Sequence, residues 1–247
     1  MSLSDSTLLS VNAVLVAPKL TEAAPKRASR AFKEALGPLL GDRFSGRWLH
    51  TSGGPRQEEA QSPSPEPFLL LTAPDERMRV QVDEKMVNIS LAAAHSGPST
   101  RTTDVVEMPT LGEAWDAFTQ VCFLTANILK EQCNTAISRL GVVAKVRWQK
   151  PENPVALLQN LFFQPGATGD MPEELKIHFR HTVTLGKLSV NRWLFLSAVP
   201  AKLAPYLELV LDINTPADKV LDLNENQVRL FLQNVRKHWS EVDGFLE

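Results

Sequence analysis

The clearest structural signal in the sequence is Met-Arg-Val-Gln-Val-Asp-Glu-Lys-Met-Val-Asn-Ile-Ser-Leu at residues 78–91. Apolar side chains occupy every second position on both sides of Asp83-Glu84-Lys85. Because successive side chains of a strand point to opposite faces, each run predicts a strand with one buried and one solvent-exposed face. The polar tripeptide between the two runs predicts a tight turn. With Phe68 to Leu71 just before it, this region predicts an antiparallel meander over residues 68–93.

The remaining elements follow from periodicity and capping residues. Period-two or short apolar runs predict strands, and 3.6-residue stripes predict amphipathic helices. The predicted strands are Val11 to Ala17, Ile137 to Trp148, Leu175 to Val183, Leu188 to Val199 and Tyr206 to Ile213. The predicted helices are Glu22 to Leu40, Leu111 to residue 131, Val155 to Phe163 after an Asn153-Pro154 cap, and a last one capped by Asn224 and Gln227. The sequence therefore predicts an α+β fold in which helices pack two antiparallel meander units.

The order of these elements suggests two related halves, because strand, helix, meander and helix occur twice. We expect residues 1–135 to form an N-terminal half with a central helix over 111–131, and residues 136–247 to form a C-terminal half that ends in an amphipathic helix. No residue-level repeat accompanies this order. The Pro-rich residues 51–67 are favoured as an insertion within one half over a linker between domains.

Composition excludes several classes of protein. The chain has 247 residues, with 26 Lys and Arg against 28 Asp and Glu, a net charge of -2 and a pI near 6.2. This balance gives no long-range attraction to a nucleic acid, and the apolar runs are too short to span a membrane. With a polar N-terminus that lacks the features of a secretory signal, and only Cys122 and Cys133, the sequence predicts a cytoplasmic protein with reduced thiols.

Motifs for catalysis, metal binding and cofactor binding are missing. Neither Gly-x-Gly-x-x-Gly, nor a P-loop, nor Gly-x-Ser-x-Gly occurs. His178 and His181 have a spacing that suits a metal on a helix, but the surrounding residues predict a strand, on which they point to opposite faces. Cys122 lies on the apolar stripe of its helix, where a thiol behaves as a core residue. We therefore expect no catalytic residues, no metal and no cofactor.

A modest basic cluster surrounds the strand near residue 145. It consists of Arg139, Lys145, Arg147, Trp148 and Lys150. Cations with an aromatic residue are typical of single-strand nucleic-acid surfaces, but an ordinary solvated strand carries the same residues. The ordinary strand is the favoured interpretation, so nucleic acid is not the expected partner.

Three segments carry a resemblance to a known family. They are Ile137 to Val143, Asp83 to Ile89, and Leu209 to Asn214 ahead of a C-terminal helix. Together with the order of the predicted elements, they resemble a sporadically distributed family of bacterial proteins of unknown function, whose members have a similar length. The sequence departs from that family after Gly141, where Val142-Val143-Ala144-Lys145 replaces an expected Arg-Tyr-x-Asn. The resemblance implies a bacterial α+β protein and does not indicate an activity, because the function of the family is not established.

Three hypotheses for function follow from these patterns. The first is a non-enzymatic protein that binds a protein partner or self-associates as a homo-oligomer, with an aromatic anchor chosen from Phe162, Phe163, Trp193, Trp239 and Phe245. The second is a small-molecule or lipid pocket between a curved sheet and the helix from Leu111 to Leu129, lined by His178, Arg180, His181 and Trp193. The third is an enzyme in which one of the two histidines meets a carboxylate.

Overall fold

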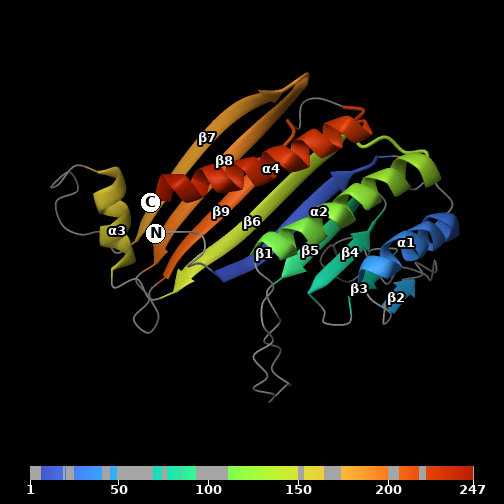
Figure 1. Ribbon diagram of the computed structural model, residues 1–247, viewed down its shortest axis with the longest axis horizontal. Helices are drawn as coiled ribbons and strands as arrows, with labels where there is room; N and C mark the ends of the chain where they lie inside the picture. Colours follow the sequence, from blue (N-terminus) through green and yellow to red (C-terminus); the bar gives the residue numbers. More distant parts are fainter. Residues whose placement is uncertain are drawn as a thin grey trace, which may run out of the picture. The chain divides into compact units, whose positions relative to one another are not determined.

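The computed structural model describes residues 7–18, 20, 25–40, 45–48, 69–73, 77–83, 85–92, 111–149, 153–163, 174–199, 206–216 and 221–246. The chain divides into two compact units. Unit 1 comprises Met1–Val11, Val142–Pro216 and Gln233–Glu247, and unit 2 comprises Asn12–Gly141 and Ala217–Leu232. Both units combine helices with a sheet, so the protein has an α+β fold (Figure 1).

Unit 2 contains the meander that residues 78–91 predict. Its strands are β1 (Thr7–Val16, from Asn12 onward), β2 (Ser45–Trp48), β3 (Leu69–Thr72), β4 (Met78–Val82) and β5 (Met86–Ala92), in the order β2-β3-β4-β5-β1. β2, β3, β4 and β5 pair antiparallel in succession. The alternation of buried and half-buried residues along β4 and β5 confirms the predicted strands with one buried face.

The turn between β4 and β5 depends on Asp83, a buried acid. Its carboxylate accepts hydrogen bonds from the backbone N–H groups of Lys85, at 2.9 Å, and Met86, at 2.8 Å. A short side chain that satisfies backbone donors two and three residues ahead stabilises a tight turn. The sequence predicts this turn, and the two bonds explain how the acid tolerates burial.

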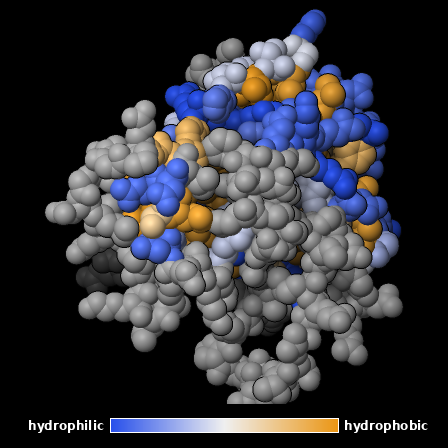
Figure 2. Space-filling view, turned by 60° about the vertical axis from the view of Figure 1, so that its left-hand side comes forward, coloured by the Kyte–Doolittle hydropathy of each residue, from blue (hydrophilic) through white to orange (hydrophobic). Residues whose placement is uncertain are grey.

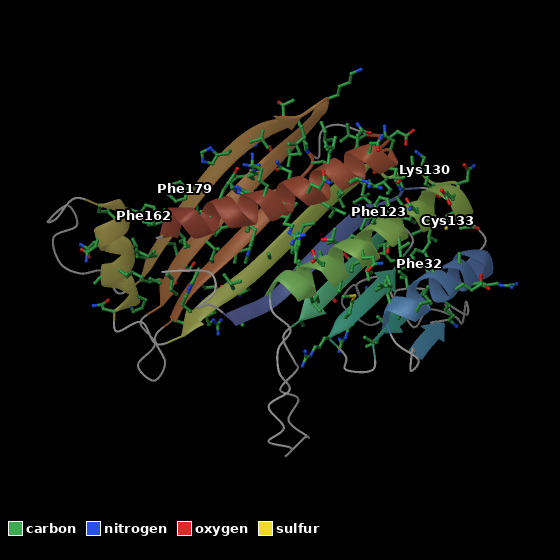
Figure 3. All side chains as sticks on the ribbon, in the orientation of Figure 1. Phe32, Phe123, Lys130, Cys133, Phe162 and Phe179 are labelled. Atoms are coloured by element: carbon green, nitrogen blue, oxygen red, sulfur yellow. The ribbon has the colours of Figure 1, made fainter. Side chains whose placement is uncertain are left out.

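Helices cover the apolar face of this sheet. α1 (Pro25–Leu40) contacts β3, and α2 (Leu111–Asn127) contacts β5 and α1. α2 continues into the π-helical turn η3 (Ile128–Gln132), so the predicted central helix is confirmed. Phe32, Phe118, Cys122 and Leu129 are fully buried between these elements. Figure 3 shows Phe32 on α1, Phe123 on α2, Lys130 on η3 and Cys133 directly after η3.

Unit 1 contains the second predicted meander. β6 (Arg139–Gln149, from Val142 onward), β7 (Leu175–Leu185), β8 (Leu188–Val199) and β9 (Tyr206–Asn214) follow the order β6-β9-β8-β7. β7 pairs antiparallel with β8 over its full length, and β8 pairs antiparallel with β9. Gly186, with a φ of 60°, adopts the left-handed conformation that the two-residue turn between β7 and β8 requires.

Two helices accompany this sheet. α3 (Pro154–Phe162) begins as predicted, with Asn153 Oδ1 accepting from the N–H of Ala156 at 2.9 Å. α4 (Glu225–Leu246) begins with the predicted reciprocal cap, because the N–H of Gln227 donates to Asn224 and the N–H of Asn224 donates to the Gln227 side chain. Residues 225–232 of α4 belong to unit 2 and residues 233–246 to unit 1.

The two units differ from the predicted halves, which divided the chain once after residue 135. Each unit is assembled from separate segments, because β1, β6 and α4 each begin in one unit and end in the other. β2 is a strand that the sequence patterns did not predict. The loop over residues 51–67 lies outside the described residues, so its role as insertion or linker stays a prediction.

Candidate functional site on the sheet of unit 1

The sheet of unit 1 has two different faces. On one face, Leu188, Val190, Leu194 and Leu196 of β8 are buried, as are the alternate residues of β9 from Leu207 to Ile213. α3 and α4 pack on this covered face: Phe162 of α3 lies 5.5 Å from Phe179 of β7 between ring centroids (Figure 3). On the other face, which we call the open face, every alternate residue of β8 from Ser189 to Ser197 is only half-buried.

The open face carries a group of cations and aromatic rings that we call the Trp193 cluster: His178, Arg180, Trp193 and Phe195. The antiparallel register places His178 opposite Phe195 and Arg180 opposite Trp193. The Trp193 and Phe195 rings stack at 5.9 Å with an interplanar angle of 5°. The Arg180 guanidinium lies 4.8 Å from the Trp193 ring, and the His178 ring meets Phe195 edge-on at 4.8 Å.

These contacts join the four side chains into one amphipathic platform. A guanidinium within about 6 Å of a tryptophan ring is attracted by the ring's negative face. Stacked aromatic pairs at this separation add an attraction of their own. Since His178 and Arg180 are exposed while the two rings are half-buried, the platform offers flat apolar area with charged donors at its margin.

Near this platform, a carboxylate neutralises part of the positive charge of the basic strand around residue 145. Glu208 of β9 pairs with Lys145 at 2.9 Å and with Arg147 at 2.8 Å, and the Arg147 guanidinium stacks 4.0 Å from the Tyr206 ring. Burial is the largest influence on Glu208 and raises its pKa, but the hydrogen bonds and charges of Lys145 and Arg147 together bring the pKa below its ordinary value. The carboxylate is therefore ionised at neutral pH and offsets part of the basic charge that the sequence displays. Lys150 of the predicted basic cluster lies outside the described residues.

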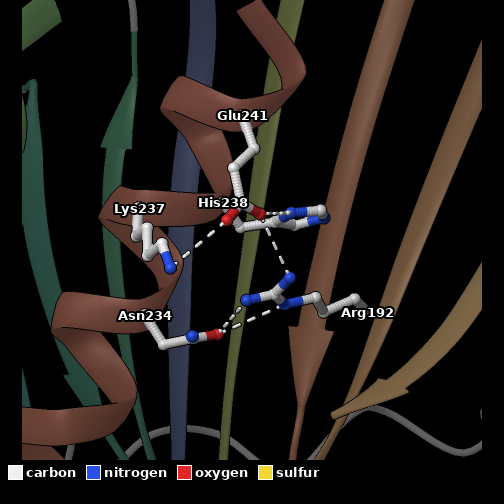
Figure 4. A network of polar contacts seen from close by, with 5 residues as sticks. All are labelled: Arg192, Asn234, Lys237, His238 and Glu241. Atoms are coloured by element: carbon white, nitrogen blue, oxygen red, sulfur yellow. Dashed lines mark hydrogen bonds and ion pairs between the residues drawn. The ribbon is translucent and has the colours of Figure 1, made fainter. Parts of the chain in front are cut away.

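Arg192 on the covered face is the centre of a second polar group (Figure 4). Its Nε and Nη2 donate to Asn234 Oδ1 at 3.2 and 2.8 Å, and its Nη1 lies 3.2 Å from Glu241 Oε2. The same carboxylate contacts His238 Nδ1 at 3.1 Å and Lys237 Nζ at 3.6 Å. Asn234, Lys237, His238 and Glu241 all lie on α4, so Arg192 links this helix to β8.

The electrostatics of this second group favour an uncharged histidine. Burial lowers the pKa of His238 most, and the nearby charges of Arg192 and His181 lower it further, against the opposing effect of Glu241. The hydrogen bond from His238 is the main reason that the pKa of Glu241 is lowered. A neutral imidazole held by a carboxylate has the chemistry of a general base, but here the carboxylate also binds Arg192 and Lys237.

The structure brings together three of the four residues predicted to line a site. His178, Arg180 and Trp193 share the open face, whereas His181 lies opposite Arg192 in register, on the covered face. The two histidines therefore point to opposite faces, as the strand prediction required. The helix from Leu111 to Leu129 belongs to unit 2 and the four residues to unit 1, so a common pocket stays a prediction.

Other predicted features have clear places in the structure. Trp148 is buried, which excludes it as an exposed stacking surface for a base. Cys122 is buried, and burial raises the pKa of its thiol well above the ordinary value, as expected for a core cysteine. Phe163 is 39% exposed and Trp239 is half-buried, whereas the side chain of Phe245 lies outside the described part of the chain. Among the described residues, no three His, Cys, Asp or Glu side chains come close enough to hold a metal ion.

The described surface on one side of the molecule is mixed in character. In Figure 2 the described part of the visible face is largely hydrophilic, and hydrophobic side chains reach it in separate areas. None of the described helices is long and apolar enough to cross a membrane.

Comparison with known proteins gives one distant structural likeness. No protein-family model matches the chain, and no curated protein matches it. The structure of a rolling circle replication initiator protein from Geobacillus stearothermophilus aligns with 93% of this chain and 79% of its own, at 8% identity and a TM-score of 0.31. A likeness at this level does not bear on fold or function.

Several residues of the Trp193 cluster, of the basic strand near residue 145 and of the Arg192 group were not predicted from the sequence. Phe195 was treated only as a strand residue, although its position two residues after Trp193 places both rings on one face. Glu208 is the sole acid among residues 206–211 of its strand and directly precedes an apolar run. An isolated acid in such a strand is a signal for an ion pair with cations on a neighbouring strand. Arg192 and Glu241 are far apart in the sequence, and only the packing of α4 on β8 reveals their contact.

Proposed function

We propose that this protein is a non-enzymatic binding protein that holds another protein on the open face of unit 1, with Trp193 as the anchor. The observation that supports this proposal is the stacked Trp193 and Phe195 pair, flanked by Arg180 and His178 on a face whose side chains are only half-buried. Trp and Arg are the residue types that contribute most to binding energy at protein interfaces.

The charge distribution favours a protein over a nucleic acid as the occupant. A nucleic-acid surface needs several cations that are free to neutralise phosphates. On this face Glu208 already pairs with Lys145 and Arg147, and the whole chain carries a net charge of -2. The apolar area of the two rings, in contrast, is suited to the well-packed centre of a protein interface.

A site-specific photocrosslinker tests this proposal in cells that make the protein. We would place it at Asn191, a half-buried residue of the open face, and at Lys130, an exposed residue of η3 in unit 2, as the matched control. We expect a product of one discrete mass from position 191 only, which the Trp193→Ala substitution abolishes. The purified partner should then bind the wild-type chain at least about tenfold more tightly than the Trp193→Ala variant, as expected for an interface anchor.

Three outcomes would overturn the proposal. Equal crosslinking from positions 191 and 130 would show that the contact is non-specific. A product of twice the chain mass would show that the face binds a second copy of this protein and not a different protein. A crosslinked product that persists in the Trp193→Ala variant would place the binding surface elsewhere.

A further inference from the structure

β7 is an edge strand among the described strands of unit 1. It stands at the end of the order β6-β9-β8-β7, and β8 is its single neighbour there. Its pairing with β8 is continuous from Leu175 to Leu185, without a bulge that would twist the edge away. Native sheets usually protect such an edge, because its free backbone groups can pair with another strand.

The hairpin geometry identifies the backbone groups on the outer edge of β7. Leu185 pairs with Leu188 around the two-residue turn, and in such a hairpin this first pair is hydrogen-bonded. Hydrogen-bonded and non-bonded pairs then alternate along the strands. The backbone groups directed outward are therefore those of Lys176, His178, Arg180, Thr182 and Thr184.

The apolar side chains of β7 are incompletely covered. Ile177, Phe179, Val183 and Leu185 are all half-buried, although they lie on the covered face. In β8 the corresponding leucines and valine are buried. One further strand beside β7 would cover this apolar row and would satisfy the outward backbone groups at the same time.

The charge on this hairpin specifies the chemistry of such a strand. Residues 175–207 contain no Asp or Glu, but they contain Lys176, Arg180, Lys187, Arg192, Lys202 and two histidines. Arg192 pairs with Glu241 on the covered face, and Lys176 pairs with Glu174 at 2.9 Å in an exposed ion pair. Arg180 and Lys187 are exposed as well. A second copy of β7 would add only cations, and like charges on adjacent strands repel.

We propose that β7 accepts an extended, acidic segment of the partner protein as an additional strand. This inference rests on the proposed function and deepens it: the Trp193 cluster anchors the partner, and the edge of β7 takes a strand in which Asp or Glu alternates with apolar residues. The acidic side chains lie beside His178 and Arg180 on the open face, and the apolar ones extend the row of Ile177, Phe179 and Val183.

Two labelled peptides of about ten residues, the length of β7, provide the test. One alternates Val with Glu, and the matched control alternates Val with Lys. In a fluorescence anisotropy titration at low salt, we expect the Glu peptide to bind at least about tenfold more tightly than the Lys peptide. In hydrogen exchange, the bound Glu peptide should slow exchange in β7 and leave the strands of unit 2 unchanged.

Substitutions separate edge pairing from simple charge attraction. Thr182→Pro removes an outward N–H, and an edge strand tolerates proline there. Thr182→Val is its control, because it loses the same hydroxyl, which contacts Asn191 at 3.3 Å, but keeps the N–H. We expect at least about tenfold weaker binding of the Glu peptide to Thr182→Pro and to Arg180→Glu. Binding should be unchanged in Thr182→Val and in Lys130→Glu, which makes the same charge change in unit 2.

Several outcomes would overturn this inference. Equal binding of the two peptides would show that the cations of this hairpin do not select an acidic strand. Unchanged binding to a folded Thr182→Pro variant would exclude backbone pairing. An oligothymidylate that binds more tightly than the Glu peptide, with the same affinity for Thr182→Pro, would make the occupant a nucleic acid. If the crosslinked partner depends on Trp193 but not on Thr182→Pro, the proposed function stands and the edge-strand proposal fails.

Discussion

Replacing Arg192 by methionine removes the link between β8 and α4 while it retains most of the apolar stem. The side chain is 12% exposed and donates twice to Asn234 and once toward Glu241. Hydrogen bonds from a charged donor contribute about 1.5 kcal/mol or more, and both bonds to Asn234 share one acceptor, so we count them once. The Glu241 carboxylate is 44% exposed, and solvent screening reduces that pair to about 0.5 kcal/mol.

We therefore expect Arg192→Met to lower the free energy of unfolding by about 2 kcal/mol. Urea unfolding followed by circular dichroism measures this loss. Arg180→Met is the matched control on the neighbouring strand, where an exposed guanidinium above Trp193 contributes about 0.5 kcal/mol. Because the charge of Arg192 lowers the pKa of His238, an NMR titration should also show that pKa rising in Arg192→Met.

Equal losses in the two variants would refute the reasoning. They would mean that Arg192 is no more important than a surface arginine, and that α4 depends on its apolar face alone. A loss of stability without any change in the pKa of His238 would contradict the electrostatic part of the argument, while it would leave the hydrogen bonds intact.

Three further predictions concern pH, the β4–β5 turn and the basic strand. Since folding lowers the pKa of His238 below 6.5 and those of Glu208 and Glu241 below 4.5, protonation favours the unfolded chain, and urea midpoints should fall as pH drops below about 6.5 and again below about 4.5. His238→Gln should remove the first decrease and weaken the second, because the contact with His238 is the main cause of the lowered pKa of Glu241 while Glu208 keeps its own partners. Asp83→Ala should lower the free energy of unfolding by about 1 to 2 kcal/mol in urea unfolding, and an equal loss in Asp83→Asn would contradict the role of the side-chain oxygen in the turn. Glu208→Gln leaves Lys145 and Arg147 without their carboxylate, so fluorescence anisotropy should show tighter oligothymidylate binding than in the wild-type chain, and added salt should weaken it. Glu225→Gln is the control, and unchanged binding in Glu208→Gln would contradict the proposed neutralisation of these cations.

The sequence was sufficient to predict the elements whose signals are local. Alternation of apolar and polar residues located β4 and β5, and the caps at Asn153 and Asn224 located the starts of α3 and α4. These signals depend on neighbouring residues alone, because side-chain direction and capping are set within a few positions. β2 has only four residues, Ser45–Trp48, and its pairing with β3 decides its structure, so it gave no such signal.

The candidate site could be predicted only in part. Trp193, Arg180 and His178 were selected as lining residues, and the strand pattern already separated His178 from His181. The register that joins them to Phe195 depends on the length of the turn at Gly186, which alternation does not specify. Contacts such as Arg192 with Glu241 arise from the docking of a helix across a sheet, and no local pattern encodes the partner.

The division of the chain has a consequence for synthesis on the ribosome. Unit 1 includes Gln233–Glu247 and unit 2 includes Ala217–Leu232, and each unit also contains residues from much earlier in the chain. Each unit contains part of α4, so neither unit has all of its residues until α4 has left the exit tunnel. Before that point the sheet of unit 1 lacks α4, which Arg192 of β8 contacts in the folded chain, and apolar surface exposed in this way is prone to aggregation.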